Sequence, residues 1–293
     1  MKFDVAKAVT DSIIKMIESG VSGNEWKAPW ANAFAVPTNY ITGKKYRGIN
    51  VLLLWGAGDS ENYKSKYWAT YNQWKSKGYT LKDAKNKGKM IVFWKLIDGE
   101  KTDKNGNTEK VKIPFLRYSK VFNADLVEGF EEPTENLETI TNGERLPSVD
   151  KVIEDTGAII EHGGNRACYI PSVDKINLPT FESFTSVEGY YSTALHELAH
   201  WTGHEDRLSR DFSGRFGDES YAFEELIAEL SAAFTCSSLG ITSETRQDHA
   251  SYIASWLKVL KNDKKAIITA ASQAAKASEY IIAGNAETVK KAA

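Results

Sequence analysis

Hydrophobic and polar residues follow two different periods in the first 124 residues. Apolar positions at helical spacing predict helices over residues 5–18, 49–55 and 70–78. Residues 90–96 are β-branched or aromatic and are followed by an Asp98-Gly99 turn, after which residues 111–121 can return as a hairpin partner. This part of the chain therefore predicts an α+β fold with a small antiparallel sheet.

After residue 150 the period is mostly helical. The pattern predicts helices over residues 151–160, 192–202, 221–239, 249–261 and 264–282. Two short runs, 168–170 and 175–178, predict a pair of strands. The whole chain is thus predicted to be α+β, with a C-terminal part that is mainly helical and holds a small sheet.

The segment between these two parts is acidic and has no sustained periodicity. Residues 125–150 contain prolines at 133 and 147 and are rich in glutamate. Such composition is typical of a linker. We therefore expect one domain over residues 1–124, an acidic linker over 125–150 and a second domain over 151–293, in agreement with a length of 293 residues.

The net charge of -2 conceals a division between the two predicted domains. Residues 1–124 hold 22 basic and 11 acidic residues, whereas the rest of the chain holds 15 and 28. Such a reversal indicates that the two parts meet different partners. Six of the eight tryptophans also lie in the basic part, at positions 26, 30, 55, 68, 74 and 94.

Lysines interleaved with aromatic residues suit a groove for single-stranded nucleic acid. Ammonium groups neutralise phosphates and release counterions, while bases stack on aromatic rings. The alternative is a solvated lysine-rich surface over a tryptophan-rich core. The candidate contacts are Lys44, Lys45, Arg47, Trp68, Trp74, Lys75, Lys87 and Lys89.

The segment YYSTALHELAHWTGHEDRL contains the pattern His-Glu-x-x-His at His196, Glu197 and His200. On a helix, residues four apart lie on one face, so both imidazoles can reach a single metal ion. The intervening glutamate lies beside the open coordination position and can act as general base toward metal-bound water. This pattern predicts a zinc site of the metallopeptidase type.

A catalytic zinc requires a third protein ligand, for which the sequence offers three candidates. Glu225 and Glu229 lie one turn apart on a later helix, which resembles the gluzincin arrangement, with Glu225 as ligand and Glu229 orienting a histidine. Alternatively, HExxHxxGxxD resembles a metzincin pattern in which Asp206 is the ligand. His204 is too far along an unbroken helix from His196 to share an ion with it.

The expected chemistry is activation of a water molecule for peptide hydrolysis. Glu197 accepts a proton from that water and passes it to the leaving amine, while a nearby donor stabilises the oxyanion. Tyr190, Tyr191 and Tyr221 are candidate donors. We expect an extended peptide substrate to pair with an edge strand in RACYIPSVDKINLP, which precedes the motif helix.

The same motifs, together with YWATYNQWKSKGYTLKDAKNKGKMIVFWK, resemble the ArdC-type antirestriction proteins of conjugative plasmids along the whole chain. This resemblance implies an N-terminal domain that binds single-stranded DNA, also found fused to TraC-type plasmid primases, and a C-terminal zincin-like metallopeptidase domain. It implies protection of incoming plasmid DNA from host restriction and a protein substrate presented near DNA. The metal that the HExxH pattern predicts is zinc, with manganese as the alternative.

Other features limit the setting in which the protein acts. Cys168 and Cys236 are isolated, which argues against a disulfide framework and against a cysteine zinc cluster. No apolar run is long enough to span a membrane, and the first twenty residues lack the apolar core of a signal peptide. We therefore expect a cytoplasmic protein. Two alternatives stay open: a zincin fold kept for protein contact, and a processing peptidase without a nucleic-acid role.

Overall fold

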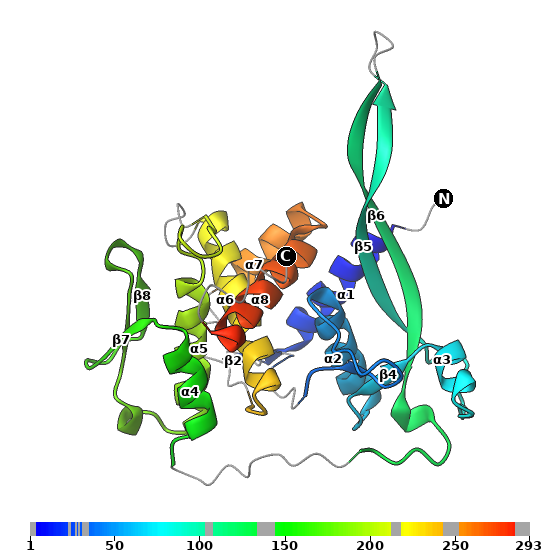
Figure 1. The fold of residues 1–293 in the computed structure, drawn as a ribbon, viewed down its shortest axis with the longest axis horizontal. Helices are drawn as coiled ribbons and strands as arrows, with labels where there is room; N and C mark the ends of the chain where they lie inside the picture. The colour runs from blue at the N-terminus through cyan, green and yellow to red at the C-terminus, as the bar shows by residue number, and fades with distance from the viewer. Residues whose placement is uncertain are drawn as a thin grey trace.

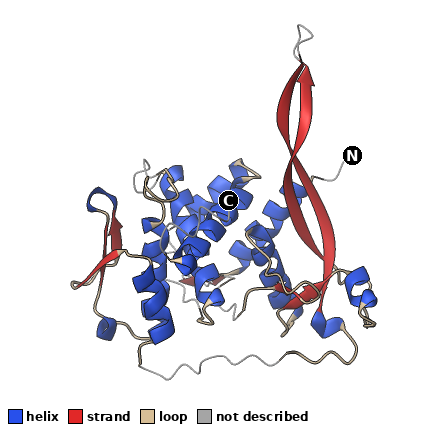
Figure 2. Cartoon of the chain, in the orientation of Figure 1, coloured by secondary structure: helices blue, strands red, loops and turns tan. Residues whose placement is uncertain are grey.

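The structure is a computed structural model that describes residues 4–22, 25–26, 28, 30, 35–102, 108–133, 144–211, 218–242 and 252–284. For residues 22, 25–26, 94–97, 101–102 and 108–115 it describes the backbone only. The helices form most of the body, while a long hairpin lies at one side and a small sheet at the other (Figure 2). The fold is α+β, as predicted.

The N-terminal helices are α1 (Val5–Ser19), α2 (Ile49–Glu61) and α3 (Tyr71–Ser76). Two of the three, α1 and α3, begin at a side-chain cap. The Asp4 carboxylate accepts a hydrogen bond from the Lys7 amide and so starts α1. Thr70 and Gln73 form a capping box at α3, in which each side chain bonds the other residue's backbone amide. All three predicted helices are confirmed.

The N-terminal sheet has the order β3-β4-β6-β5 and is mixed. Its strands are β3 (Thr38–Asn39), β4 (Tyr67–Ala69), β5 (Lys89–Thr102) and β6 (Thr108–Asn123). The pair β3–β4 is parallel, so the prediction of a purely antiparallel sheet is wrong. The short strands β1 (Val21–Ser22) and β2 (Glu25–Trp26) form a separate antiparallel pair.

Strands β5 and β6 form the predicted hairpin, which projects from the body as a long twisted ribbon (Figure 1). The predicted turn at Asp98-Gly99 is wrong, because Asp98 pairs with Lys112 and Gly99 with Val111 inside the ribbon. The ladder continues past the dipeptide as far as the pair Thr102 and Thr108. A turn dipeptide permits a turn without requiring one.

The C-terminal part contains α4 (Pro147–Asp155), α5 (Val187–Trp201), α6 (Glu219–Ser238), α7 (Ile253–Asn262) and α8 (Ala266–Ala283). Its small sheet has the order β7-β9-β8, with β7 (Ile159–His162), β8 (Cys168–Ile170) and β9 (Lys175–Leu178). Both predicted strands are confirmed. The helix predicted over 151–160 ends early, because Gly157 at a φ of +75° turns the chain before β7. Short 3-10 turns lie at Ala124–Leu126, Pro171–Val173 and Phe181–Ser183.

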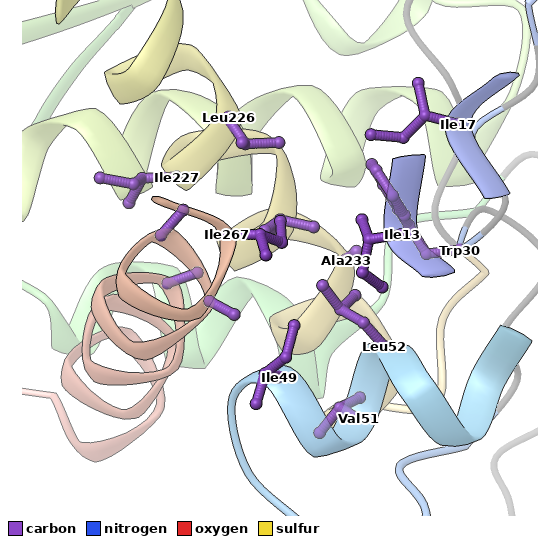
Figure 3. Packing of buried hydrophobic residues seen from close by; sticks show 14 of the residues in the cluster. Ile13, Ile17, Trp30, Ile49, Val51, Leu52, Leu226, Ile227, Ala233 and Ile267 are labelled. Carbon is purple, nitrogen blue, oxygen red and sulfur yellow. The ribbon is translucent and has the colours of Figure 1, made fainter. Parts of the chain in front are cut away.

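Helices from both ends of the chain share one hydrophobic core. Ile13 of α1 and Leu52 of α2 belong to the same buried cluster as Leu226 of α6 and Ile267 of α8 (Figure 3). A second cluster is built around α5 and the C-terminal sheet. The predicted division at residues 124 and 150 remains a prediction, and residues 134–143 of the predicted linker lie outside the described residues.

None of the helices in the part of the chain that the structure describes is both long and apolar enough to cross a membrane.

Candidate metal centre

The two histidines of the HExxH pattern lie on α5 and face α6. Ser186 starts this helix by accepting a hydrogen bond from the Gly189 amide, which places His196 and His200 one turn apart in its regular part. Both imidazoles are largely buried, and their Nε2 atoms are 3.2 Å apart. The helix therefore presents two nitrogen ligands to one point, as its spacing predicts.

Glu225 of α6 supplies the third donor. Its Oε2 lies 3.5 Å from His196 Nε2, and its Oε1 lies 3.4 Å from His200 Nε2. In a tetrahedral zinc site with bonds of about 2.0–2.1 Å, neighbouring ligand atoms are ~3.4 Å apart. Among the described residues, these three form a group whose ligand atoms could hold one metal ion. The donor set and its spacing fit a divalent cation.

Glu197 is buried beside the histidines, and its Oε2 accepts a hydrogen bond of 2.8 Å from the Tyr169 amide. Tyr169 lies on β8, an edge strand of the described three-stranded sheet. β8, the edge strand expected to pair with an extended peptide substrate, thus lies next to the candidate metal centre. However, the Tyr169 N–H that such a peptide would pair with is already taken by Glu197 in this structure.

Glu229 lies where the sequence places it, one turn after Glu225. Its Oε2 is 3.9 Å from His196 Nδ1, and its Oε1 accepts a hydrogen bond of 3.2 Å from the Trp30 indole. Trp30 is fully buried in the core shared by both ends of the chain. A residue of the N-terminal part therefore holds a carboxylate that faces a candidate metal ligand.

Sequence reasoning missed Glu224, which supports the other histidine. Its Oε1 lies 3.2 Å from His200 Nδ1, and both carboxylate oxygens bond Arg210, at 2.7 and 2.9 Å. Arg210 also donates to the Ala199 carbonyl and the Thr202 hydroxyl at the end of α5. Adjacent residues on a helix point about 100° apart, so the neighbouring glutamates at 224 and 225 can face two different histidines. This pair of glutamates was the sequence feature that could have identified Glu224.

The centre holds an excess of buried negative charge. Glu197, Glu224, Glu225 and Glu229 are all buried there, with Arg210 as a fixed cation. Burial by itself lowers the pKa of His200, but hydrogen bonds to Glu224 and Glu225 outweigh it and raise that pKa to about 10.

The carboxylates respond in the opposite direction. Burial by itself raises the pKa of both Glu224 and Glu225. His196 and His200 nevertheless hold the pKa of Glu225 well below its usual range, and His200 and Arg210 lower that of Glu224. A second cation beside the arginine is therefore favoured at this position.

The alternative ligands lie apart from this group. The chain leaves the helix after Trp201, and the Asp206 side chain is 82% exposed, with its Oδ2 3.5 Å from His204 Nδ1. The metzincin-like pattern needs Asp206 to face the two histidines, which it does not do here. His204 Nδ1 accepts a hydrogen bond from the Asp206 amide, and His204 does not belong to the group formed by His196, His200 and Glu225.

A cavity of about 530 Å³ opens onto the centre. Tyr221 and Tyr252 line it from the helical side, and Arg166, Cys168 and Tyr169 line it from the side of β8. Of the three candidate oxyanion donors, Tyr221 is the one that lines this cavity. Tyr190 and Tyr191 are buried elsewhere and bond His162 and Asp150, respectively.

The candidate nucleic-acid contacts divide into three groups. Trp68 and Trp74 are only 2% and 0% exposed, so the prediction that they stack on bases is corrected: their indoles form part of the core. Lys87 and Lys89 both pair with Glu61. The remaining four basic residues, Lys44, Lys45, Arg47 and Lys75, are exposed. Among them, Arg47 pairs with Glu279.

Other aromatic residues of the basic part are accessible, although the sequence did not single them out. Tyr71, Phe93 and Tyr118 are each about half exposed. Phe93 and Tyr118 lie on neighbouring strands of the hairpin, and Phe93 faces Arg117 across the pair. A strand's alternation could have marked them, but the register that decides which face is covered is a property of the folded hairpin.

Two family models match the chain. The N-terminal domain of anti-restriction factor ArdC matches residues 3–122, and a zincin-like metallopeptidase domain matches residues 147–273. An uncharacterized protein of Sinorhizobium fredii (strain NBRC 101917 / NGR234), y4eC, is 38% identical over 285 residues, covering 95% of this chain and 91% of the relative. The DNA primase TraC of Escherichia coli is 36% identical over 293 residues, covering 94% of this chain but 27% of the primase.

Crystal structures of the antirestriction ArdC protein from the R388 plasmid have the same fold. The metal-free form has a TM-score of 0.80 at 40% identity, and the Mn(II)-bound form has 0.78 at 37%. Each alignment covers 95% of this chain and 97% of the other. The chain therefore belongs to the ArdC family of antirestriction proteins and joins that family's N-terminal domain to a zincin-like metallopeptidase domain.

Proposed function

We propose that this protein binds single-stranded DNA through its basic N-terminal part, carries a metallopeptidase-type centre, and protects incoming plasmid DNA from host restriction. The observation that carries the enzymatic half is the grouping of His196, His200 and Glu225, whose ligand atoms lie close enough together to share one ion. The family supports the antirestriction role.

The metal would be Zn²⁺ or Mn²⁺, held by His196, His200 and Glu225, and it would supply Lewis acidity toward a substrate carbonyl and a water molecule. A related ArdC protein binds Mn(II), and the zincin-like fold supports zinc. Glu197 is the general base, and the Tyr169 amide holds its carboxylate toward the cavity. Glu224 orients the imidazole of His200 through a contact of 3.2 Å, and Glu229 faces that of His196 at 3.9 Å.

Tyr221 is the candidate oxyanion donor. Burial, together with Tyr252 and Glu225, raises the pKa of its hydroxyl, so this group stays protonated and can donate at neutral pH. β8 lines one side of the cavity, where an extended peptide would pair with it. The proposed substrate is a protein associated with DNA, because the basic part of the same chain would bring DNA close to the centre.

Metal analysis tests the centre directly. Purified wild-type protein is expected to retain about one equivalent of Zn²⁺ or Mn²⁺ after gel filtration, and His200→Ala is expected to lose it. His162→Ala is the matched control, because this histidine bonds Tyr190 away from the cavity. Equal metal content in wild type and His200→Ala would refute the assignment.

Replacing the general base separates catalysis from a structural role of the fold. Glu197→Gln is expected to keep the metal and oligonucleotide binding but to abolish cleavage of a casein-type test protein in the presence of single-stranded DNA. If protection of a conjugating plasmid survives this substitution unchanged, the zincin domain acts through protein contact. If wild-type protein fails to bind an oligonucleotide, the proposed nucleic-acid role is refuted.

A further inference from the structure

A second large cleft, of about 650 Å³, lies away from the metal centre between the base of the β5–β6 hairpin and α8. Figure 1 shows these two elements on either side of α1 and α2. Val92 and Leu116 form its hairpin wall, and residues of α8 form the wall opposite. We call it the α8 cleft. Its two walls come from opposite ends of the chain.

The α8 wall is a continuous polar stripe. Lys265, Thr269, Ser272 and Lys276 line the cleft and are all exposed. Their spacings of four, three and four residues place them on one face of the helix, over a length of ~16 Å. A stripe of that length can follow a nucleic-acid backbone over several nucleotides.

The charge of the cleft has one sign. Among the described residues that line it there is no aspartate or glutamate, whereas Arg47, Lys265 and Lys276 are cationic. Arg47 pairs with Glu279, but neither lysine forms an ion pair with a carboxylate in the described part of the chain. Lys261 and Lys264 nearby are each paired with an acidic residue of the N-terminal segment. The α8 cleft therefore keeps two uncompensated ammonium groups.

The face of the hairpin that carries Leu116 also carries an aromatic ring, which lies outside the lining of the cleft. Tyr118 lies directly opposite Val92 in the register, on the same face of the hairpin as Leu116, and is 50% exposed. Phe93, with a similar exposure, lies on the other face, opposite Arg117. Cations combined with an exposed aromatic ring suit the binding of single strands, because phosphates contact the cations and bases stack on the ring.

We propose that the α8 cleft binds the backbone of single-stranded DNA, with Lys265 and Lys276 contacting phosphates and Tyr118 stacking on a base. This inference rests on the proposed function, but it assigns the phosphate contacts of the cleft to α8, which lies in the acidic C-terminal part of the chain. The acidic C-terminal part is thus a partner in DNA binding on this face, while the metal centre stays clear of it.

Oligonucleotide binding to the full-length protein, measured by fluorescence anisotropy across a salt series, tests this inference. The double variant Lys265→Ala/Lys276→Ala is expected to bind roughly tenfold more weakly at 0.1 M salt, and its slope of log K against log salt is expected to be shallower by about 1.4. The matched control is Lys151→Ala/Lys258→Ala, which removes two exposed lysines of the same part, both paired with acids.

The aromatic contact has its own control. Tyr118→Ala is expected to weaken binding at least about fivefold without changing the salt slope, whereas Phe93→Ala on the opposite face has a smaller effect. An unchanged slope in Lys265→Ala/Lys276→Ala, beside a shallower one in Lys44→Ala/Lys75→Ala, would overturn the cleft assignment while leaving DNA binding intact. No binding by wild-type protein would overturn both proposals.

Discussion

Individual side chains set the geometry of the metal centre, and several of them never approach the metal position. Glu224 and Glu229 face the outer nitrogens of His200 and His196, and they are themselves held by Arg210 and Trp30. Such partners fix the orientation and the tautomer of a ligating imidazole. The sequence singled out the candidate ligands and Glu229, but it did not single out Glu224.

Glu224→Gln removes a carboxylate while preserving its shape. Metal affinity is expected to fall about 10–100-fold, because His200 loses the acceptor that orients it and Arg210 loses its counter-charge. Competition with a chromophoric chelator measures this change. Glu219→Gln, an exposed change on the same helix, serves as control. Equal affinities in the two variants would show that Glu224 does not orient the ligand.

At the scale of elements, an ion pair joins the turn between β8 and β9 to the segment that follows α5. Arg207 bonds both carboxylate oxygens of Asp174, at 2.5 and 3.0 Å, and also bonds the Trp201 carbonyl. The Tyr169 hydroxyl donates to the same carboxylate. The strand that carries the Tyr169 amide is therefore fixed to the helix that carries the histidines.

This ion pair predicts a pH-dependent contribution to stability. Arg207 holds the pKa of Asp174 below its ordinary value of 3.8, so the stabilisation is complete above that value and is lost as pH falls through the lower folded pKa. Asp174→Asn is expected to cost about 1 kcal/mol at pH 6, a modest value because Asp174 is partly exposed. Urea unfolding of both proteins between pH 6 and 3 should show the difference narrowing below pH 4. A difference independent of pH would contradict this.

At the scale of the whole molecule, helices from the two ends of the chain pack into one hydrophobic core. The core that contains Ile13 of α1 also contains Leu226 of α6 and Ile267 of α8. The Trp30 indole extends this connection to Glu229 beside the metal centre. Two family models therefore match regions whose hydrophobic residues are buried together.

Such a shared core predicts cooperative unfolding. Ile13→Ala is expected to lower the free energy of unfolding by about 2–5 kcal/mol, because it leaves a cavity among helices from both ends. Calorimetry is expected to show one transition that shifts as a whole. Val21→Ala, at an exposed position of the same segment, should have little effect. Two separate transitions, with only one shifted by Ile13→Ala, would contradict a common core.

The sequence by itself determined the features that depend on local spacing. Helical periodicity located the helices, the i, i+4 rule brought His196 and His200 together, and one turn of helix placed Glu229 after Glu225. Its errors were also local. Asp98-Gly99 lies inside a hairpin instead of ending a strand, and β7 begins where the helical pattern was extended too far.

Only the tertiary structure decided which residues from distant segments meet. It buried Trp68 and Trp74, left Tyr118 exposed, set Glu224 against His200, and placed α8 opposite the hairpin. The physical reason is that periodicity identifies which face of an element is apolar, but not what covers it. That choice depends on packing between elements far apart in the chain, which no local pattern encodes.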